Sequence, residues 1–429
     1  WIENPLLSPV AIGKRLNAVE ELYENEIERK ELILALGGIG DMERIVARAV
    51  YGSANARDLL NLASALGEIP NLKALLGSPS SAELKNILSQ LDPLEELRDE
   101  LERAISVEAP LTIREGGIIA DGYSAEVDRL RDILSGGEKT MIEIETRERE
   151  RTGIKKLRVR YNKVFGYYIE ISKAENIEPP ADYIRKQTVT NAERYINEEL
   201  KIMEGELLTA QERVKALEYE LFTALRQKIA ALVETIQRTA AAAARLDVLC
   251  SFAQVARDEG YVKPTVDCSD IIRIKDGRHP VVEKVLKGSL FVPNDTDMNS
   301  DDELVQIITG PNMAGKSTYM RQVALIVLMA HIGCFVSAAS AHIGVVDRIF
   351  TRVGASDDLA SGQSTFMVEM SEVAQILAEA TPKSLLILDE IGRGTSTFDG
   401  MSMARAIAEY TAGKKSHDHR HHRRKSAAL

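Results

Sequence analysis

The residues whose types and spacing most clearly suggest chemistry lie in the segment ITGPNMAGKSTYMRQ, residues 308–322. Gly310, Gly315, Lys316 and Ser317 fit the pattern G-x-x-x-x-G-K-S/T. In such a loop the backbone N–H groups surround a phosphate chain, the lysine reaches the outer phosphates, and the hydroxyl binds Mg²⁺. Because the pattern has few fixed positions, the flanking segments must decide between this chemistry and an ordinary glycine turn.

The flanking segments favour the phosphate loop. The apolar run ELVQII before Gly310 predicts a buried strand, and TYMRQVALIVLMAHIG after Ser317 predicts a buried helix. A glycine loop between a strand and a helix N-terminus is suited to anions, because the free N–H groups of the helix point at the ligand. We therefore expect the phosphate chain of a nucleotide as the ligand and Mg²⁺ as its cofactor, with Lys316 on the outer phosphates and Ser317 on the metal.

A second candidate site follows the run Leu385 to Leu388, which predicts a buried parallel strand. Asp389 and Glu390 come directly after it. We assign Asp389 to Mg²⁺ and Glu390 to the attacking water, because one carboxylate can hold the metal while the next orients or deprotonates water. Taken alone, two acids after a strand would more often be a solvated strand end, so this assignment depends on the glycine loop.

Composition indicates a globular chain of two or three domains, since 429 residues carry 45% hydrophobic and 28% charged side chains. The three cysteines, Cys250, Cys268 and Cys334, lack metal-ligand spacing, and a reducing cytoplasm fits them best. Residues 322–346 contain no Asp, Glu, Lys or Arg. We interpret them as a buried helix, turn and strand, and we expect no membrane partner.

The net charge of −11 hides a basic segment. Between residues 147 and 163 there are eight basic residues and two acidic ones, a balance of +6, with alternation that predicts β-strands. Such a patch suits contact with the DNA backbone, although a strand with one solvated basic face would look the same. The candidate DNA-binding residues in and after this segment are Arg158, Arg160, Lys163, Arg185, Lys186 and Asn191.

The rest of the chain before residue 260 predicts helices. Residues 1–122 show apolar positions three and four apart. From Leu200 the apolar residues repeat at intervals of 3 and 4, as in a coiled coil, and no proline occurs between Pro180 and Pro264. We predict one helix over about 191–257, roughly 100 Å long, unless Gly205 or the alanine run breaks it. It would connect distant sites or form part of a bundle core.

Several segments are specific enough to indicate a family. GRHPVVE, TGPNMAGKSTYMRQ, ASDDLASGQSTFMVEM and LDEIGRGTSTFDG, in this order, resemble the ATPase domain of the MutS family of DNA mismatch repair proteins. YNKVFGYYIEISKA and DYIRKQTVTNAERYINEEL resemble the DNA clamp and lever of that family. The resemblance implies a multidomain α + α/β fold: a helical core domain (1–122), an inserted β-rich clamp (123–195), lever helices (196–260), an ABC-type P-loop ATPase domain (261–413) and a polar tail (414–429).

The resemblance also implies roles for individual residues. Phe291 would stack on adenine, and Ser364 would lie on a signature loop that reaches the nucleotide of the opposite subunit. Residues 392–400 would contact that subunit, so the family pattern implies a dimer. Glu390 and Lys316 would be catalytic. The nucleotide loop would comprise Gly310, Pro311, Asn312, Met313, Ala314, Gly315, Lys316, Ser317 and Thr318.

The chain departs from the family pattern at both ends. No Phe-x-Glu mismatch-reading motif precedes the core, and after AIAEYTAGKK neither the switch histidine strand nor the dimerisation helices follow. We expect a fragment. The final segment SHDHRHHRRKSAAL predicts a solvated tail, and its histidines receive no metal assignment: His417, His419, His421 and His422.

These patterns predict an ATP-hydrolysing mismatch-repair subunit that binds mismatched or branched double-stranded DNA. Its partners would be a second copy or related subunit and a downstream ATPase of the MutL type. Two alternatives stay open: a nucleotide- and DNA-binding fragment with little turnover, and a relative that acts in recombination. A chromosome-cohesion type of ATPase is disfavoured, because it would need a longer coiled coil and no FGYYIE clamp.

Overall fold

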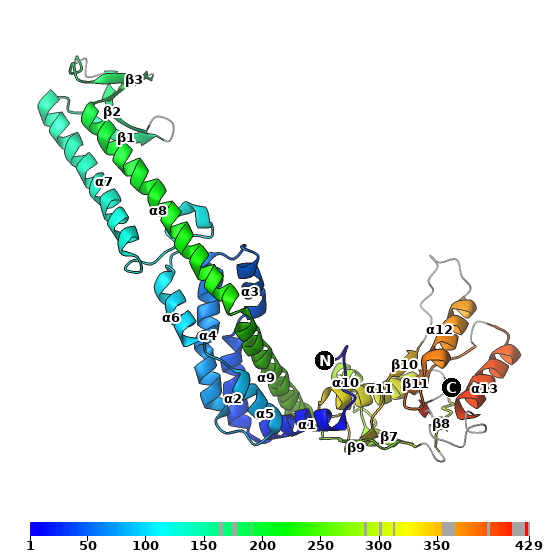
Figure 1. Cartoon of the computed structure of the whole chain (residues 1–429). Helices are drawn as coiled ribbons and strands as arrows, with labels where there is room; N and C mark the ends of the chain where they lie inside the picture. Colours follow the sequence, from blue (N-terminus) through cyan, green and yellow to red (C-terminus); the bar gives the residue numbers. More distant parts are fainter. Residues whose placement is uncertain are drawn as a thin grey trace. The chain divides into compact units, whose positions relative to one another are not determined.

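In this computed structural model, two compact units make up the chain (Figure 1). The first unit contains Trp1–Leu36, Leu72–Leu91 and Ala241–Leu429, and the second contains Gly37–Asn71 and Asp92–Ala240. The structure describes the chain apart from residues 163–165, 174–177, 190, 287–289, 300–302, 312–313, 354–364, 393–394, 414–424 and 428–429, and apart from the side chains of 138, 365, 413 and 425–427. The domain boundaries expected at residues 122, 195 and 260 stay predictions.

The chain is mainly helical up to Ala104, as predicted, whereas residues 105–122 contain only one 3-10 turn. Local signals explain several helix starts: the Ser8 side chain accepts the Ala11 N–H with Pro9 as the first helical residue, and Asp41 accepts the Arg44 N–H. The elements are α1 (Pro9–Glu24), α2 (Glu26–Gly37), α3 (Met42–Val50), α4 (Ala56–Leu76), α5 (Ala82–Gln90), α6 (Glu95–Ala104) and the 3-10 turn η1 (Ile113–Glu115).

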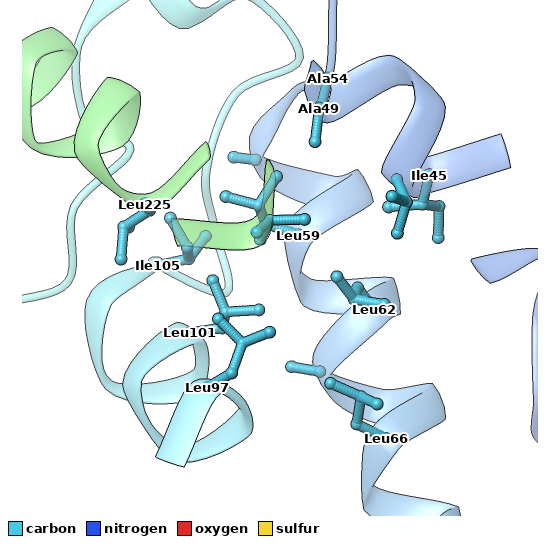
Figure 2. Packing of buried hydrophobic residues seen from close by; sticks show 14 of the residues in the cluster. Ile45, Ala49, Ala54, Leu59, Leu62, Leu66, Leu97, Leu101, Ile105 and Leu225 are labelled. Carbon is cyan, nitrogen blue, oxygen red and sulfur yellow. The ribbon is translucent and has the colours of Figure 1, made fainter. Parts of the chain in front are cut away.

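The core of the second unit is built from helices that are distant in sequence (Figure 2). Leu59, Leu62 and Leu66 of α4 pack with Leu97 and Leu101 of α6, and all five are buried. Helix α8 (Glu198–Ala231) adds apolar residues to this cluster from its C-terminal half: Phe222, Leu225 and Ile229.

The basic segment begins in a helix, which corrects the prediction of strands from residue 147. Helix α7 (Ala125–Thr152) includes Arg147, Arg149 and Arg151 and ends at Gly153, whose φ of +71° favours glycine. Acids one turn earlier on α7 explain the helix: Glu145 pairs with Arg149, and Glu148 with Arg151. Such pairs stabilise a helical surface.

The predicted strands form an antiparallel sheet of order β1-β2-β4-β3. Its inner face is apolar, with Ile169 and Tyr195 packed against Leu157, Ile144 of α7 and Leu200 of α8. In β1 the inward residue is Val159, which is partly buried, whereas Tyr161 on the same face is 49% exposed. The strands are β1 (Arg158–Asn162), β2 (Gly166–Ser172), β3 (Ile184–Thr188) and β4 (Ala192–Ile196).

The prediction of a single helix over residues 191–257 is wrong at the start of this range and in its middle. Residues 192–196 belong to β4, and Asn197 caps α8 by accepting the Leu200 N–H at 2.9 Å. Helix α8 ends at Ala231, and α9 (Val233–Glu259) begins after Leu232, which has non-helical dihedral angles. At 1.5 Å per residue α8 spans about 51 Å. Neither Gly205 nor the alanine run interrupts a helix.

Helices α7 and α8 lie side by side (Figure 1), and the apolar seam of α8 packs against α7. Leu207, Ala210 and Val214 are buried with Leu130 and Leu134 of α7. The same helix thus pairs with α7 along its first half and enters the core of the second unit along its second half. The coiled-coil type of repeat therefore packs on α7 in one part of α8, and the predicted bundle core applies to the other part. The predicted connection of distant sites stays a prediction.

The first unit carries two sheets. A mixed sheet has the order β5-β9-β6-β7, and a parallel sheet has the order β10-β11-β12-β8. The strands are β5 (Thr265–Asp267), β6 (Ile272–Gly277), β7 (Asn294–Met298), β8 (Val305–Gln306), β9 (Ser340–Gly344), β10 (Ile349–Arg352), β11 (Leu385–Leu388) and β12 (Lys425–Ala427); the helices are α10 (Pro280–Val285), α11 (Lys316–Ile332), α12 (Thr365–Glu379) and α13 (Thr397–Gly413).

Residues 322–346 form a buried helix, turn and strand, as predicted: α11, a turn at Gly333, and β9. Among the described residues, no helix is long and apolar enough to cross a membrane. The prediction that the final segment is a solvated tail is wrong in part, because Lys425–Ala427 forms β12, which lies between β11 and β8. Parallel pairing there satisfies backbone groups of both neighbouring strands, which the polar composition of the tail did not reveal.

A buried ion pair joins α7 to α8 in the second unit. The Glu218 side chain is 1% exposed and accepts from Arg131 Nη2 at 2.6 Å and from the Ile118 N–H at 3.1 Å. Arg131 also donates to the Ile119 carbonyl at 2.8 Å. This carboxylate therefore ties both helices to the segment before α7, and its charge is compensated only while Arg131 is present.

Replacing Arg131 by alanine is expected to lower the free energy of unfolding by about 3–5 kcal/mol, because the buried Glu218 side chain would lose its ion-pair partner. Arg129→Ala on the same helix is the matched control. Arg129 pairs with Glu126 at the surface, where the side chains are 66% and 40% exposed, and its loss should cost less than about 1 kcal/mol. Urea unfolding followed by circular dichroism measures both, and equal effects would contradict the proposed role of the pair.

Candidate functional site

The glycine loop lies between β8 and α11, as the sequence predicted. Gly315 is the N-cap of α11 with φ of +89°, a left-handed conformation that favours glycine. The Lys316 ammonium folds back over the loop and donates to the Gly310 carbonyl at 2.6 Å. Asn312 and Met313 lie outside the described residues. The loop thus combines free N–H groups at a helix N-terminus with a lysine, which suits a phosphate chain.

A cavity of about 690 Å³ opens beside this loop, and Phe291 is one of the residues that line it. The predicted base-stacking residue and the predicted phosphate loop therefore line one cavity, although they are distant in sequence. Ser317, the predicted metal ligand, lies in the first turn of α11. The residues lining the cavity are Phe291, Val292, Asn294, Asp295, Ile308, Thr309, Gly310, Pro311, Ala314, Gly315, Lys316, Thr318 and Tyr319.

Tyr319 connects α11 to the opposite wall of the cavity. Its phenol oxygen lies 2.9 Å from Thr296 Oγ1 and donates to the Asp295 carbonyl at 3.2 Å. Burial raises the pKa of Tyr319, so the phenol keeps its proton and its hydrogen bond. This contact fixes β7 against the helix that begins at the glycine loop, and sequence analysis did not identify it.

Asp389 and Glu390 follow β11 as predicted. Asp389 is buried, and its N–H donates to the Arg352 carbonyl at the end of β10 at 2.8 Å. Glu390 is exposed and adopts φ of +53°, which is uncommon for a residue other than glycine. Parallel strands end at one edge of the sheet, and β12 alone separates β11 from β8, so the ends of β8 and β11 lie about 10 Å apart.

Glu369 of α12 is a buried residue of this region that sequence analysis missed. It is 5% exposed and accepts the Gly392 N–H at 2.6 Å. A signal was present, because Glu369 lies three residues after Phe366 and four before Val373, on an apolar stripe of helical spacing, and a carboxylate on a buried face needs a donor. Ser364, expected on a signature loop just before α12, lies outside the described residues.

The charged sheet of the second unit is mostly neutralised by its own acids. Arg160 pairs with Glu170 at 3.5 Å, Arg185 with Glu193 at 2.6 Å, and Lys186 with Glu204 at 3.6 Å. The balance of +6 counted along the sequence therefore overstates the positive charge that these side chains leave unpaired, and their role in DNA binding stays a prediction. Asn191 accepts the Lys173 N–H through its carbonyl at 3.1 Å, and Lys163 lies outside the described residues.

Arg158 differs from the other candidate cations. In the part of the chain that the structure describes, it is exposed and makes no ion pair, and the same holds for Lys155 and Lys156 in the turn before β1. The two lysines belong to the basic segment but were not among the candidate DNA-binding residues. Arg158, Lys155 and Lys156 together carry a net positive charge. Among the described residues, this corner of the sheet is therefore the site best suited to bind a polyanion.

His279 shapes the segment that leads to Phe291. It is 6% exposed, and its Nδ1 accepts the Val282 N–H at 3.2 Å, so it caps α10 as a neutral imidazole. Burial, together with the positive charge of Arg321, lowers the pKa of His279.

Comparison with known protein families matches residues 1–253 to MutS domain III and residues 306–419 to MutS domain V. The first match alone covers more than half of the chain. The chain belongs to the MutS family. The resemblance drawn from short segments is thereby confirmed, and it extends over both units.

Individual members of the MutS family are similar over almost the whole chain. The DNA mismatch repair protein MutS of Caldicellulosiruptor saccharolyticus is 54% identical over 414 residues, which is 96% of this chain and 48% of that protein. The MutS proteins of Acetivibrio thermocellus (54% over 416 residues, 96% and 48%) and Ruminiclostridium cellulolyticum (55% over 415 residues, 97% and 48%) are similar. The chain spans about half the length of these relatives.

Because of His279, the free energy of unfolding of the first unit is expected to decrease as the pH is lowered below about 6.5. Above that pH the imidazole is neutral in the folded and unfolded chains. Below it the unfolded chain binds a proton that the folded chain, with its lowered pKa, does not, so the free energy of unfolding decreases.

The matched variant is His279→Asn, which keeps an N-cap acceptor but does not titrate. Urea midpoints at about pH 7.5 and about pH 5.5 should differ less in this variant than in the wild type. The same pH difference in both proteins would show that His279 is not the group responsible.

Proposed function

We propose that this chain is the clamp-and-ATPase portion of a DNA mismatch repair protein, which binds ATP with Mg²⁺, hydrolyses it and binds duplex DNA. The observation that carries the proposal is the shared cavity of Phe291 and the glycine loop beside α11. Family membership supports it, since the relatives are named DNA mismatch repair proteins.

Binding would use the groups around the cavity. The adenine would stack on Phe291, and the phosphates would lie along residues 310–318 at the N-terminus of α11. Lys316 would exchange its bond to the Gly310 carbonyl for one to the outer phosphates. The ammonium would give up its hydrogen bond to the Gly310 carbonyl when it binds phosphate. Its contribution to ATP affinity would therefore be the difference between the free energies of these two interactions.

The donor set suits Mg²⁺, which prefers oxygen ligands. The Ser317 hydroxyl and the Asp389 carboxylate would hold it, directly or through water. Bound Mg²⁺ supplies positive charge that stabilises the transferring phosphoryl group. Glu390 would orient a water and take its proton as the water oxygen bonds to the γ-phosphorus and the bond to the bridging oxygen breaks, giving ADP and phosphate.

The sheet of the second unit would bind the DNA backbone. Lys155, Lys156 and Arg158 would provide the main phosphate contacts, with the paired cations Arg160 and Arg185 as weaker contributors. As in the family pattern, a second copy or a related subunit would complete the nucleotide site through Ser364, and a MutL-type ATPase would act downstream. Recombination instead of repair is the second candidate for the parent protein.

Glu390→Gln is expected to retain ATP binding but to lose turnover by about 10²-fold or more, because the amide cannot accept the proton of the attacking water. Phosphate release and binding of a fluorescent ATP analogue measure the two effects. Lys316→Ala is the companion variant and should weaken binding itself.

The outcomes separate the alternatives. Turnover that rises steeply with protein concentration supports a site completed by a second subunit. Binding without turnover in the wild type supports the binding-fragment alternative. If the wild type binds no ATP, the nucleotide part of the proposal is wrong.

Arg158→Ala is expected to weaken binding to duplex DNA and to reduce the slope of log affinity against log salt by about 1, because one phosphate contact is lost. Arg185→Ala is the matched control, since its guanidinium already pairs with Glu193. Fluorescence anisotropy at several salt concentrations measures both. Equal losses in the two variants would contradict the assignment of Arg158.

A further inference from the structure

Helix α12 contacts the strand ends on both sides of Asp389 through two acids on one face. Glu369 accepts the Gly392 N–H at 2.6 Å in the turn after β11. Glu372, three residues later, forms an ion pair with Arg352 Nε at 2.7 Å at the end of β10. Arg352 in turn accepts the Asp389 N–H through its carbonyl.

These contacts lie in a packed environment. Val373 and Ile376 of α12 are buried against Leu386 and Leu388 of β11, so α12 sits firmly on the strand that ends at Asp389. Arg352 has a side chain only 9% exposed, and Glu369 is 5% exposed. The bond between Glu369 and Gly392 is a buried, charge-assisted hydrogen bond, which holds its partners more tightly than a neutral one at the surface. The contact between Glu372 and Arg352 is an ion pair in which the Glu372 side chain is 50% exposed.

The turn after β11 needs such support. Glu390 has φ of +53° and Gly392 has φ of +82°. Gly392 also passes so close to Gly400 that an added Cβ would lie 2.6 Å from the Gly400 Cα atom. Strained turns persist when their surroundings hold them, and here Glu369 is the side chain that holds the backbone two residues after Glu390.

We propose that Glu369 and Glu372 are positioning residues that hold Asp389 and Glu390 in place from α12. Glu369 acts on the turn through Gly392, and Glu372 acts on Asp389 through Arg352. The inference rests on the proposed ATPase function.

The experiment compares ATP affinity with Mg²⁺ and with a chelator, using a fluorescent ATP analogue and the whole chain. In the wild type Mg²⁺ should increase the affinity. In Glu369→Ala the ratio of ATP affinity with Mg²⁺ to ATP affinity with chelator should be smaller by about 10-fold or more, as found when other residues that orient metal ligands are lost. The ATP affinity in chelator should stay the same. Glu369→Gln keeps an oxygen acceptor for the Gly392 N–H and should restore most of the increase.

Glu379→Ala is the matched control on α12. Glu379 pairs with Arg348 at the surface, away from the turn, and its loss should leave the Mg²⁺ effect unchanged. Glu372→Ala gives a second, independent variant if Glu369→Ala does not fold. Hydrogen exchange at the Gly392 amide should become faster in Glu369→Ala and stay slow in Glu369→Gln.

The outcomes distinguish the two levels of the proposal. If the wild type binds ATP and both Glu369→Ala and Glu372→Ala keep the full Mg²⁺ effect, the positioning role is wrong and the proposed function stands. If the wild type binds no ATP in either condition, the proposed function fails, and the positioning role fails with it.

Discussion

The burial of α11 is the constraint on which the candidate nucleotide site depends. Its apolar residues, among them Val323, Ile326 and Val327, pack against both sheets of the first unit. Its C-terminal end is held as well: the Ile332 carbonyl accepts from Arg15, and the buried His331 ring accepts the Val346 N–H. A helix fixed along its length presents its N-terminus in one position, and the glycine loop is that N-terminus.

The same helix packs against strands that lead to both candidate sites. One side of α11 faces the mixed sheet, where β7 leads back to Phe291, and the other faces β11, which ends at Asp389. Phe291 and the glycine loop line one cavity beside α11, whereas Asp389, nearly 100 residues after Phe291, follows a strand packed on the same helix and is not among the residues lining that cavity. Loss of packing around α11 would therefore disturb both candidate sites.

In the second unit, ion pairs with nearby acids reduce the positive charge that the basic residues can offer to a polyanion. Acids from α7, α8 and the sheet itself neutralise most of the cations in and beside residues 147–163. A sequence count treats each charge as free, whereas ion pairs reduce the field that a polyanion experiences. The described surface that keeps a net positive charge is small, at the turn before β1 and at Arg158.

Elements with a strong local signal were predictable. The strand ending at Asp389, the buried helix after Ser317 and the apolar repeat of α8 follow from composition and spacing alone. Three predictions failed: residues 147–152 are helical, α8 ends before Leu232, and Lys425–Ala427 enters a sheet. Local pairs of Glu145 with Arg149 and of Glu148 with Arg151 account for the first failure, whereas the other two depend on contacts that are not local. No glycine or proline marks the break at Leu232, so its cause lies in packing.

The sequence by itself determined the family, the glycine loop and the order of strands and helices around it, because these depend on residue type and spacing along the chain. Only the tertiary structure decided which side chains meet. The pairing of Glu369 with Gly392, of Glu218 with Arg131 and of the basic sheet with its own acids joins residues from different elements. Hydrogen bonds and ion pairs act over a few ångströms in space, and spacing in sequence does not encode that distance.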